Sequence, residues 1–128
     1  MTARMNKLIN ELSDAPFKYG VCDCFIFTNK LVKEWHGKDY RPLHPYKNKK
    51  EAFQYLKDNV DLETLTVGTL GYPVNAEHCV DGDVAIANVG PDGSPALGFV
   101  FNGHALFKGK KQVLKLPLAE CSRGWRLR

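Results

Sequence analysis

The chain has 128 residues, a length at which one domain can bury its own core without support from disulfides or metal. The apolar fraction is 44% and the charged fraction 25%, as in an ordinary globular protein, and no apolar run is long enough for a signal peptide or a membrane span. The net charge is +4, but no stacking aromatics accompany the cluster at Lys47, Lys49 and Lys50, so no nucleic-acid partner is expected. We expect synthesis in the cytoplasm and no membrane insertion.

Two helices are the first expected elements. Apolar side chains recur at helical spacing over residues 2–13, and again from Cys24 up to Gly37. Asp23 is the expected N-cap of the second helix, because its carboxylate can accept hydrogen bonds from the free N–H groups of the first turn. Cys24 is therefore expected to be the first residue of that helix.

A third helix is expected to start at Asn48, with Glu51 three residues later in a capping-box arrangement. Its apolar face is expected to continue to Val60. Residues 61–80 contain glycines and Pro73, and they are predicted to form a short helix or turn followed by a loop.

After Asp81-Gly82 the apolar pattern changes to the alternation of strands. The expected strands span residues 83–88, 96–102, 104–108, 112–116 and 124–127. Helices followed by a meander of strands predict one α+β domain over residues 1–128, with N-terminal helices packed on a C-terminal antiparallel sheet.

Four cysteines, Cys22, Cys24, Cys79 and Cys121, do not form a compact disulfide framework, since one pair is a C-x-C and the others are far apart. A zinc site from the first three together with His78 has unsuitable spacing, because paired ligands in structural zinc sites are usually two to four residues apart. We therefore expect no metal and no cofactor.

Cys24 is the candidate nucleophile. A thiol attacks as the thiolate, and a helix N-terminus favours the anion through its free N–H groups and the helix dipole. The alternative interpretation is that Cys24 is a small apolar residue that packs at a helix start.

The order of motifs resembles that of the NlpC/p60 cysteine peptidases, whose pattern runs from an aromatic residue and glycine through Asp-Cys to Gly-Asp and a second core strand. The corresponding residues here are Gly20, Asp23-Cys24, Gly82-Asp83 and Ala96-Leu97-Gly98-Phe99. Phe25-Ile26 replaces the Ser-Gly that follows the nucleophile in the family. The resemblance implies a papain-like fold with Cys24 as the catalytic residue.

Nearly the whole chain also resembles small phage tail-gene proteins of an uncharacterised NlpC-like group. These share the motifs above and a terminal Cys-x-x-x-Trp-Arg, which here is Cys121 to Arg126. This resemblance implies a place in the virion tail after synthesis in the host cytoplasm, with other phage tail proteins as partners.

The chain departs from the family at the general base. The family carries a histidine at the start of the second core strand, where this chain has Ala96, and the group that orients the base falls on Phe107 or Lys108. His36, His78 and His104 are expected at the far end of the sheet or of the helix. The position of His44, in a proline-rich loop, stays open.

Three hypotheses follow. The first is a tail-tip or tail-assembly component with a degenerate cysteine-peptidase fold, in which Cys24 is vestigial. The second is an active murein peptide hydrolase that acts on peptidoglycan peptide, with Cys24 as nucleophile and His44 as base. The third is a thiol-dependent binding or redox module that uses Cys22 and Cys24 and needs both thiols accessible.

Overall fold

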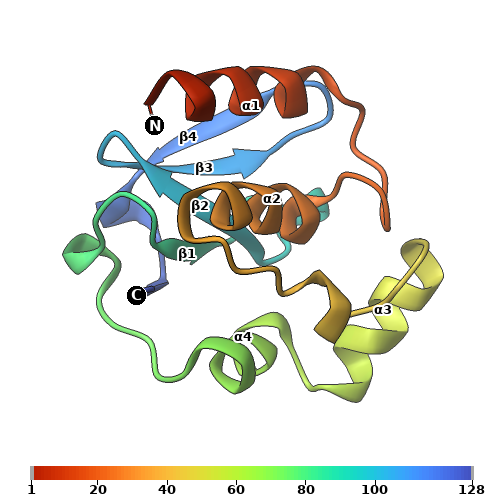
Figure 1. Cartoon of the computed structure of the whole chain (residues 1–128). Helices are drawn as coiled ribbons and strands as arrows, with labels where there is room; N and C mark the ends of the chain where they lie inside the picture. Colours follow the sequence, from red (N-terminus) through yellow and green to blue (C-terminus); the bar gives the residue numbers. More distant parts are fainter. Residues whose placement is uncertain (1, 128) are drawn as a thin grey trace.

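The computed structural model describes residues 2–127 and has an α+β architecture of helices followed by one antiparallel sheet (Figure 1). Its helices are α1 (Thr2–Asp14), α2 (Cys24–His36), α3 (Lys49–Asp58) and α4 (Leu62–Leu70). Its strands are β1 (Val84–Ala87), β2 (Ala96–Phe101), β3 (His104–Lys108), β4 (Val113–Pro117) and β5 (Arg123–Trp125). The coarse fold class predicted from the sequence is confirmed.

The helix ends are set by local signals in the sequence. Gly37 ends α2 in the left-handed conformation, with φ of 76°, and its N–H donates to the Lys33 carbonyl. Asn48 caps α3 by accepting a hydrogen bond from the Glu51 N–H at 2.9 Å. The helix ends at Asp58, so Val60, to which its apolar face was expected to continue, lies beyond it with a left-handed φ of 76° and is exposed.

The sheet has the strand order β4-β3-β2-β1-β5. The first four strands form a meander, whereas β5 returns to pair with the free edge of β1, with Val84 opposite Trp125. The expected strand at 124–127 is shorter than predicted, because Arg126 and the Leu127 N–H turn to the side chain of Asp83 instead of continuing the ladder.

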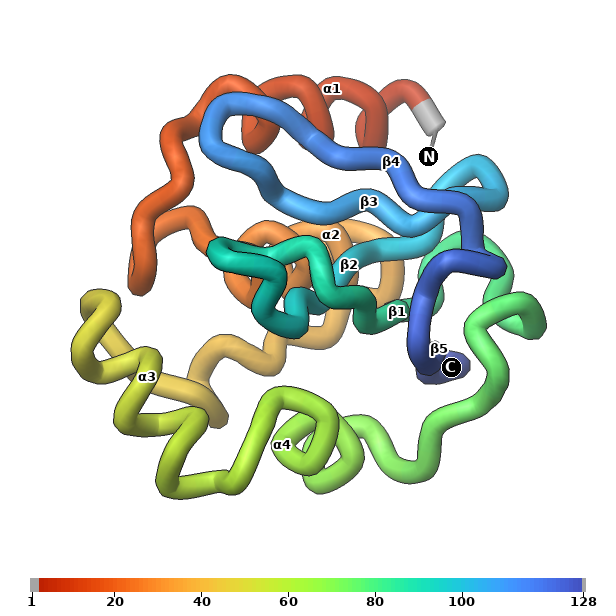
Figure 2. The backbone as a smooth tube through the Cα atoms, turned by 180° about the vertical axis from the view of Figure 1, so that it is seen from behind, coloured from red at the N-terminus to blue at the C-terminus, as the bar shows by residue number. Residues whose placement is uncertain are grey.

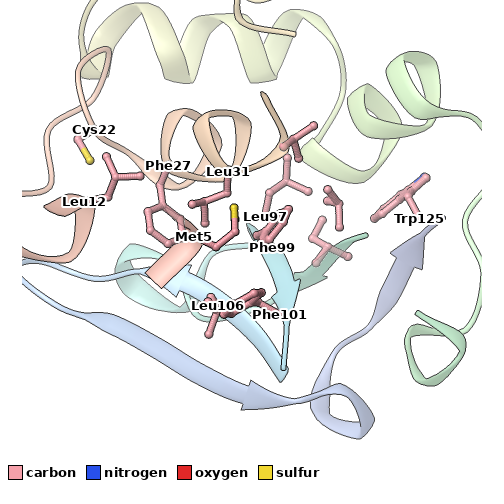
Figure 3. Close-up of a cluster of buried hydrophobic side chains, with 13 residues drawn as sticks. Met5, Leu12, Cys22, Phe27, Leu31, Leu97, Phe99, Phe101, Leu106 and Trp125 are labelled. Carbon is pink, nitrogen blue, oxygen red and sulfur yellow. The ribbon is translucent and has the colours of Figure 1, made fainter. Parts of the chain in front are cut away.

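The main core lies between one face of the sheet and the helices α1 and α2 (Figure 3). Alternate residues of β2, Leu97, Phe99 and Phe101, point into it, as the period of two in a strand requires. Phe27 and Leu31 of α2 meet them from the other side and are fully buried. This packing fixes α2, and with it Cys24, against the sheet.

The other face of the sheet carries a second cluster made largely of small side chains, here called the alanine cluster. Its buried members are Cys79, Ala85, Ala87, Ala96, Val100, Ala105 and Phe107. Cys24 packs against this cluster as a partly buried neighbour. The start of α2 therefore contacts the same cluster that contains Ala96.

Helices α3 and α4 lie on the side of α2 that faces away from α1, in both views of the chain (Figures 1 and 2). Residues 61–80, which the sequence predicts to be a short helix or turn followed by a loop, contain α4 and a short 3₁₀ turn at Ala76–His78. The indole N–H of Trp125 donates to the Gly71 carbonyl at 3.0 Å, and this bond ties the end of α4 to the sheet.

Candidate functional site

Cys24 is the first residue of α2, and Asp23 is its N-cap, as the sequence predicts. One oxygen of Asp23, Oδ1, accepts a hydrogen bond from the Ile26 N–H at 2.9 Å. The thiol of Cys24 donates to the carbonyl oxygen of Lys108, at the end of β3, over 3.6 Å. The helix start is thereby joined directly to the sheet.

The second oxygen of Asp23 accepts hydrogen bonds from two neighbouring loops. Oδ2 accepts from the Gly20 N–H at 3.0 Å and from the Tyr46 hydroxyl at 2.6 Å, and the side chain of Asp23 is fully satisfied although only 2% of the residue is exposed. Gly20 has a φ of 84°, and a Cβ there would collide with the Lys47 carbonyl. Only glycine therefore lets the chain before α2 pass so close to the loop that carries Tyr46.

The electrostatics at Cys24 oppose the thiolate. Burial and the charge of Asp23 raise the pKa of the thiol to about 12, and the Lys108 cation offsets only part of this rise. The sequence argument that a helix N-terminus favours the anion is outweighed here, because the thiol is buried and, as a second cause, its N-cap neighbour Asp23 is negatively charged. At neutral pH Cys24 is a protonated thiol.

The residues that the resemblance places at the base and at its orienting group, Ala96 and Phe107 or Lys108, make other contacts. Ala96 is buried at the start of β2 in the alanine cluster, and Phe107 is fully buried in the same cluster. The Lys108 ammonium donates to the carbonyls of Gly109 at 2.8 Å and Ser13 at 3.3 Å. Lys108 thus interacts with the C-terminal turn of α1, where the helix dipole favours a cation.

His44 is buried and lines the same cavity as Cys24. Its Nδ1 pairs with the Tyr55 hydroxyl at 2.7 Å and its Nε2 with the Thr69 hydroxyl at 3.1 Å. Burial and the nearby Arg41 cation lower the pKa of this imidazole. His44 therefore joins its loop to α3 and α4 as a neutral ring.

His36 and His104 lie away from Cys24. His36 Nε2 pairs with the Gly82 carbonyl at 2.7 Å, at the end of α2 opposite Cys24. His104 lies opposite Phe101, at the far end of β2 from Ala96, as the strand count predicts. Within residues 2–127, no histidine nitrogen is hydrogen-bonded to the Cys24 sulfur.

A cavity of about 530 Å³ opens beside Cys24 and is here called the Cys24 cavity. It lies among the start of α2, the first residues of β1 and β2, and the segment that carries His44, α3 and α4. Its lining is rich in apolar side chains, among them Phe17, Phe25, Leu56, Leu65, Leu70 and Val84. Sequence patterns did not indicate this cavity, because its walls come from segments far apart in the chain.

The remaining cysteines do not complete a site with Cys24. All four thiols are free, and Cys22 is buried, whereas the redox hypothesis requires it to be accessible. Cys79 lies at the other end of β1, where its sulfur contacts the Val84 carbonyl at 3.9 Å. Over the described part of the chain, no three His, Cys, Asp or Glu side chains gather as metal ligands.

The pattern of a domain of unknown function, DUF6950, matches residues 1–127. The chain belongs to this family. No curated protein matches the chain. None of the helices in residues 2–127 is long and apolar enough to cross a membrane.

A second polar centre, which the sequence did not predict, joins the Gly-Asp and Trp-Arg motifs. Asp83 is buried and forms an ion pair with Arg126 at 2.9 Å. Its two oxygens also accept hydrogen bonds from the Val80 N–H at 2.8 Å and the Leu127 N–H at 2.9 Å. The sequence offers only an acidic residue before the first strand and a basic residue after the last tryptophan, with nothing to indicate that the two meet.

Proposed function

We propose that this chain is a catalytically inactive relative of the NlpC/p60 cysteine peptidases that serves as a structural component of a phage tail tip. The peptidase kinship is supported by a cysteine at the start of a helix that packs on an antiparallel sheet, together with the order of the motifs around it. The place in a tail is supported by the resemblance of nearly the whole chain to small phage tail proteins.

The observation that carries the inactive assignment is the chemistry around Cys24. A cysteine peptidase needs a thiolate, a base that returns the proton to the leaving amine, and a group that orients this base. Here the pKa of the thiol is raised to about 12, Ala96 occupies the base position, and the Lys108 ammonium is engaged with α1.

Peptide cleavage is the direct test. We expect the purified chain to leave peptidoglycan stem peptides intact, and Ala96→His to increase the alkylation rate of Cys24 near neutral pH by placing an imidazole beside it. Ala96→Gln is the matched control, because it adds bulk at the same position without a base. Cleavage by the unmodified chain that is lost in Cys24→Ser would overturn the inactive assignment.

The structural role has its own test. Peptides of this chain should be found by mass spectrometry in purified phage particles, at a constant ratio to a known tail protein. Contacts with tail proteins are expected to use exposed apolar side chains, of which Tyr72 is 92% exposed and Val60 75%. Infectious particles that lack the chain would contradict the proposal.

One observation favours the hydrolase as a second candidate. His44 lines the same cavity as Cys24, and its lowered pKa keeps the ring in the neutral form that a base requires. To act, its ring would have to leave Tyr55 and Thr69. In that case His44→Gln would abolish peptide cleavage, whereas His104→Gln would leave it unchanged.

A further inference from the structure

The Cys24 cavity extends beyond the thiol into the space between the body of the protein and the α3–α4 segment. Cys24, Ala96 and Val84 belong to the side formed by α2 and the sheet, whereas Leu56 and Leu65 belong to α3 and α4. A volume of about 530 Å³ is that of sites which hold small molecules.

The buried polar side chains in the wall are already paired within the protein. His44 uses both ring nitrogens, the Thr66 hydroxyl donates to the Leu62 carbonyl at 2.7 Å, and the Thr28 hydroxyl donates to the Leu97 carbonyl at 3.0 Å. No buried side-chain nitrogen or oxygen of residues 2–127 lacks a hydrogen-bond partner. A peptide in the buried part of the cavity would find no unpaired side-chain nitrogen or oxygen for its own N–H and C=O groups, which is unfavourable.

The charges of the wall argue against an anion. Asp23, Asp61 and Asp92 line the cavity, and Lys49 is the one Lys or Arg among the lining residues. Lys49 is exposed and lies over the Phe53 ring, 5.4 Å from its centre, beside the contact between Phe53 and Tyr19. Among the side chains that line the cavity, carboxylates therefore outnumber cations, and this disfavours a carboxylate head group.

We propose that the Cys24 cavity binds an uncharged, mainly aliphatic small molecule, with Cys24 as part of its apolar wall. This ligand site is independent of the proposed function, since an inactive tail protein can either have it or lack it. It is distinct from a peptide site, because its wall is mainly apolar and its buried side-chain nitrogen and oxygen atoms already have hydrogen-bond partners within the protein.

The alkylation rate of Cys24 reports whether a ligand occupies the Cys24 cavity. The probe is 1-octanol, and the readout is the rate at which iodoacetamide alkylates Cys24 at alkaline pH, with Cys121, which lies outside the cavity, as internal reference. At a 1-octanol concentration ten times its dissociation constant about one tenth of the cavities stay empty, so the Cys24 rate should fall about tenfold. The rate at Cys121 should not change.

Two variants and a second probe make the assignment specific. Leu65→Trp fills the cavity and should abolish protection by 1-octanol, whereas Leu43→Trp, the same change at an exposed position outside the lining, should retain it. Octanoate should protect Cys24 less than 1-octanol at equal concentration. The proposal is overturned if 1-octanol leaves the Cys24 rate unchanged, if it still protects Leu65→Trp, or if octanoate protects better. Peptide cleavage and particle composition, which test the proposed function, are measured separately.

Discussion

Two buried aspartates, each beside a cysteine, occupy different regions of this molecule. Asp23 lies next to Cys24 at the start of α2, and Asp83 lies near Cys79 at the start of β1; each aspartate is 2% exposed. Each accepts two backbone N–H groups and one side-chain donor. The donor is the neutral Tyr46 hydroxyl for Asp23 and the Arg126 guanidinium for Asp83.

The pKa values of the two thiols are shifted in the same direction. Burial and the neighbouring carboxylate raise the pKa of Cys24 to about 12 and that of Cys79 to about 11, where Arg126 counteracts the rise. A perturbed thiol therefore does not by itself mark a functional site in this fold. Cys24 differs because it borders a cavity of about 530 Å³, whereas the Asp83 centre ties the C-terminal segment to β1.

The largest loss of stability is expected from removing Arg126, the charged partner of Asp83. Arg126→Met removes the cation that pairs with the buried Asp83 side chain, and we expect it to lower the free energy of unfolding by about 3 kcal/mol in urea denaturation. Arg123→Met, at an exposed arginine of β5 three residues before Arg126, should change it by less than about 0.5 kcal/mol. Equal effects of the two changes would mean that the ion pair is not responsible.

Removing the neutral partner should have a smaller effect. Tyr46→Phe deletes the 2.6 Å hydrogen bond to Asp23 and should lower the free energy of unfolding by about 2 kcal/mol, since Asp23 keeps its two backbone donors. Tyr72→Phe removes a hydroxyl from an exposed ring and serves as the control. A loss for Tyr46→Phe larger than that for Arg126→Met would reverse the comparison.

The raised thiol pKa values predict a loss of stability in alkali. The folded protein keeps a proton on Cys24 that the unfolded chain releases near the ordinary pKa of 9.0, so stability is full below that pH and falls as the pH rises toward about 12. The slope is at most about 1.4 kcal/mol per pH unit for each thiol. Cys24→Ala should flatten the curve up to about pH 12 and Cys79→Ala only up to about pH 11. Unchanged slopes in both variants would exclude these thiols as the cause.

The charge of Asp23 can be separated from its role as a cap. An Asn amide oxygen can still accept from the Ile26 N–H, so Asp23→Asn should keep the start of α2 and lower the thiol pKa, although the amide NH₂ group cannot accept from the Gly20 N–H. A fall of one unit would raise the alkylation rate of Cys24 about tenfold at a fixed pH below that pKa. Cys121 is the reference thiol, and a parallel increase there would indicate general loosening of the structure.

The local elements could be predicted from the sequence because their signals are local. Asp23, Gly37 and Asn48 act on backbone groups within four residues, and the apolar periods of α2 and β2 report which face of each element is buried. That no histidine nitrogen of residues 2–127 is hydrogen-bonded to the Cys24 sulfur was also predictable in part, since Ala96 is a single identifiable position at a strand start.

Tertiary structure alone decided what depends on distant segments. The return of β5 to β1 brings Arg126 to Asp83, and the loop with Tyr46 brings a donor to Asp23. The thiol pKa depends on burial and on charges that residue spacing does not reveal, so a favourable helix start became an unfavourable environment for the thiolate of Cys24. The cavity exists only because α3 and α4 lie opposite α2 and the sheet, and no local sequence pattern predicts the space between two packed elements.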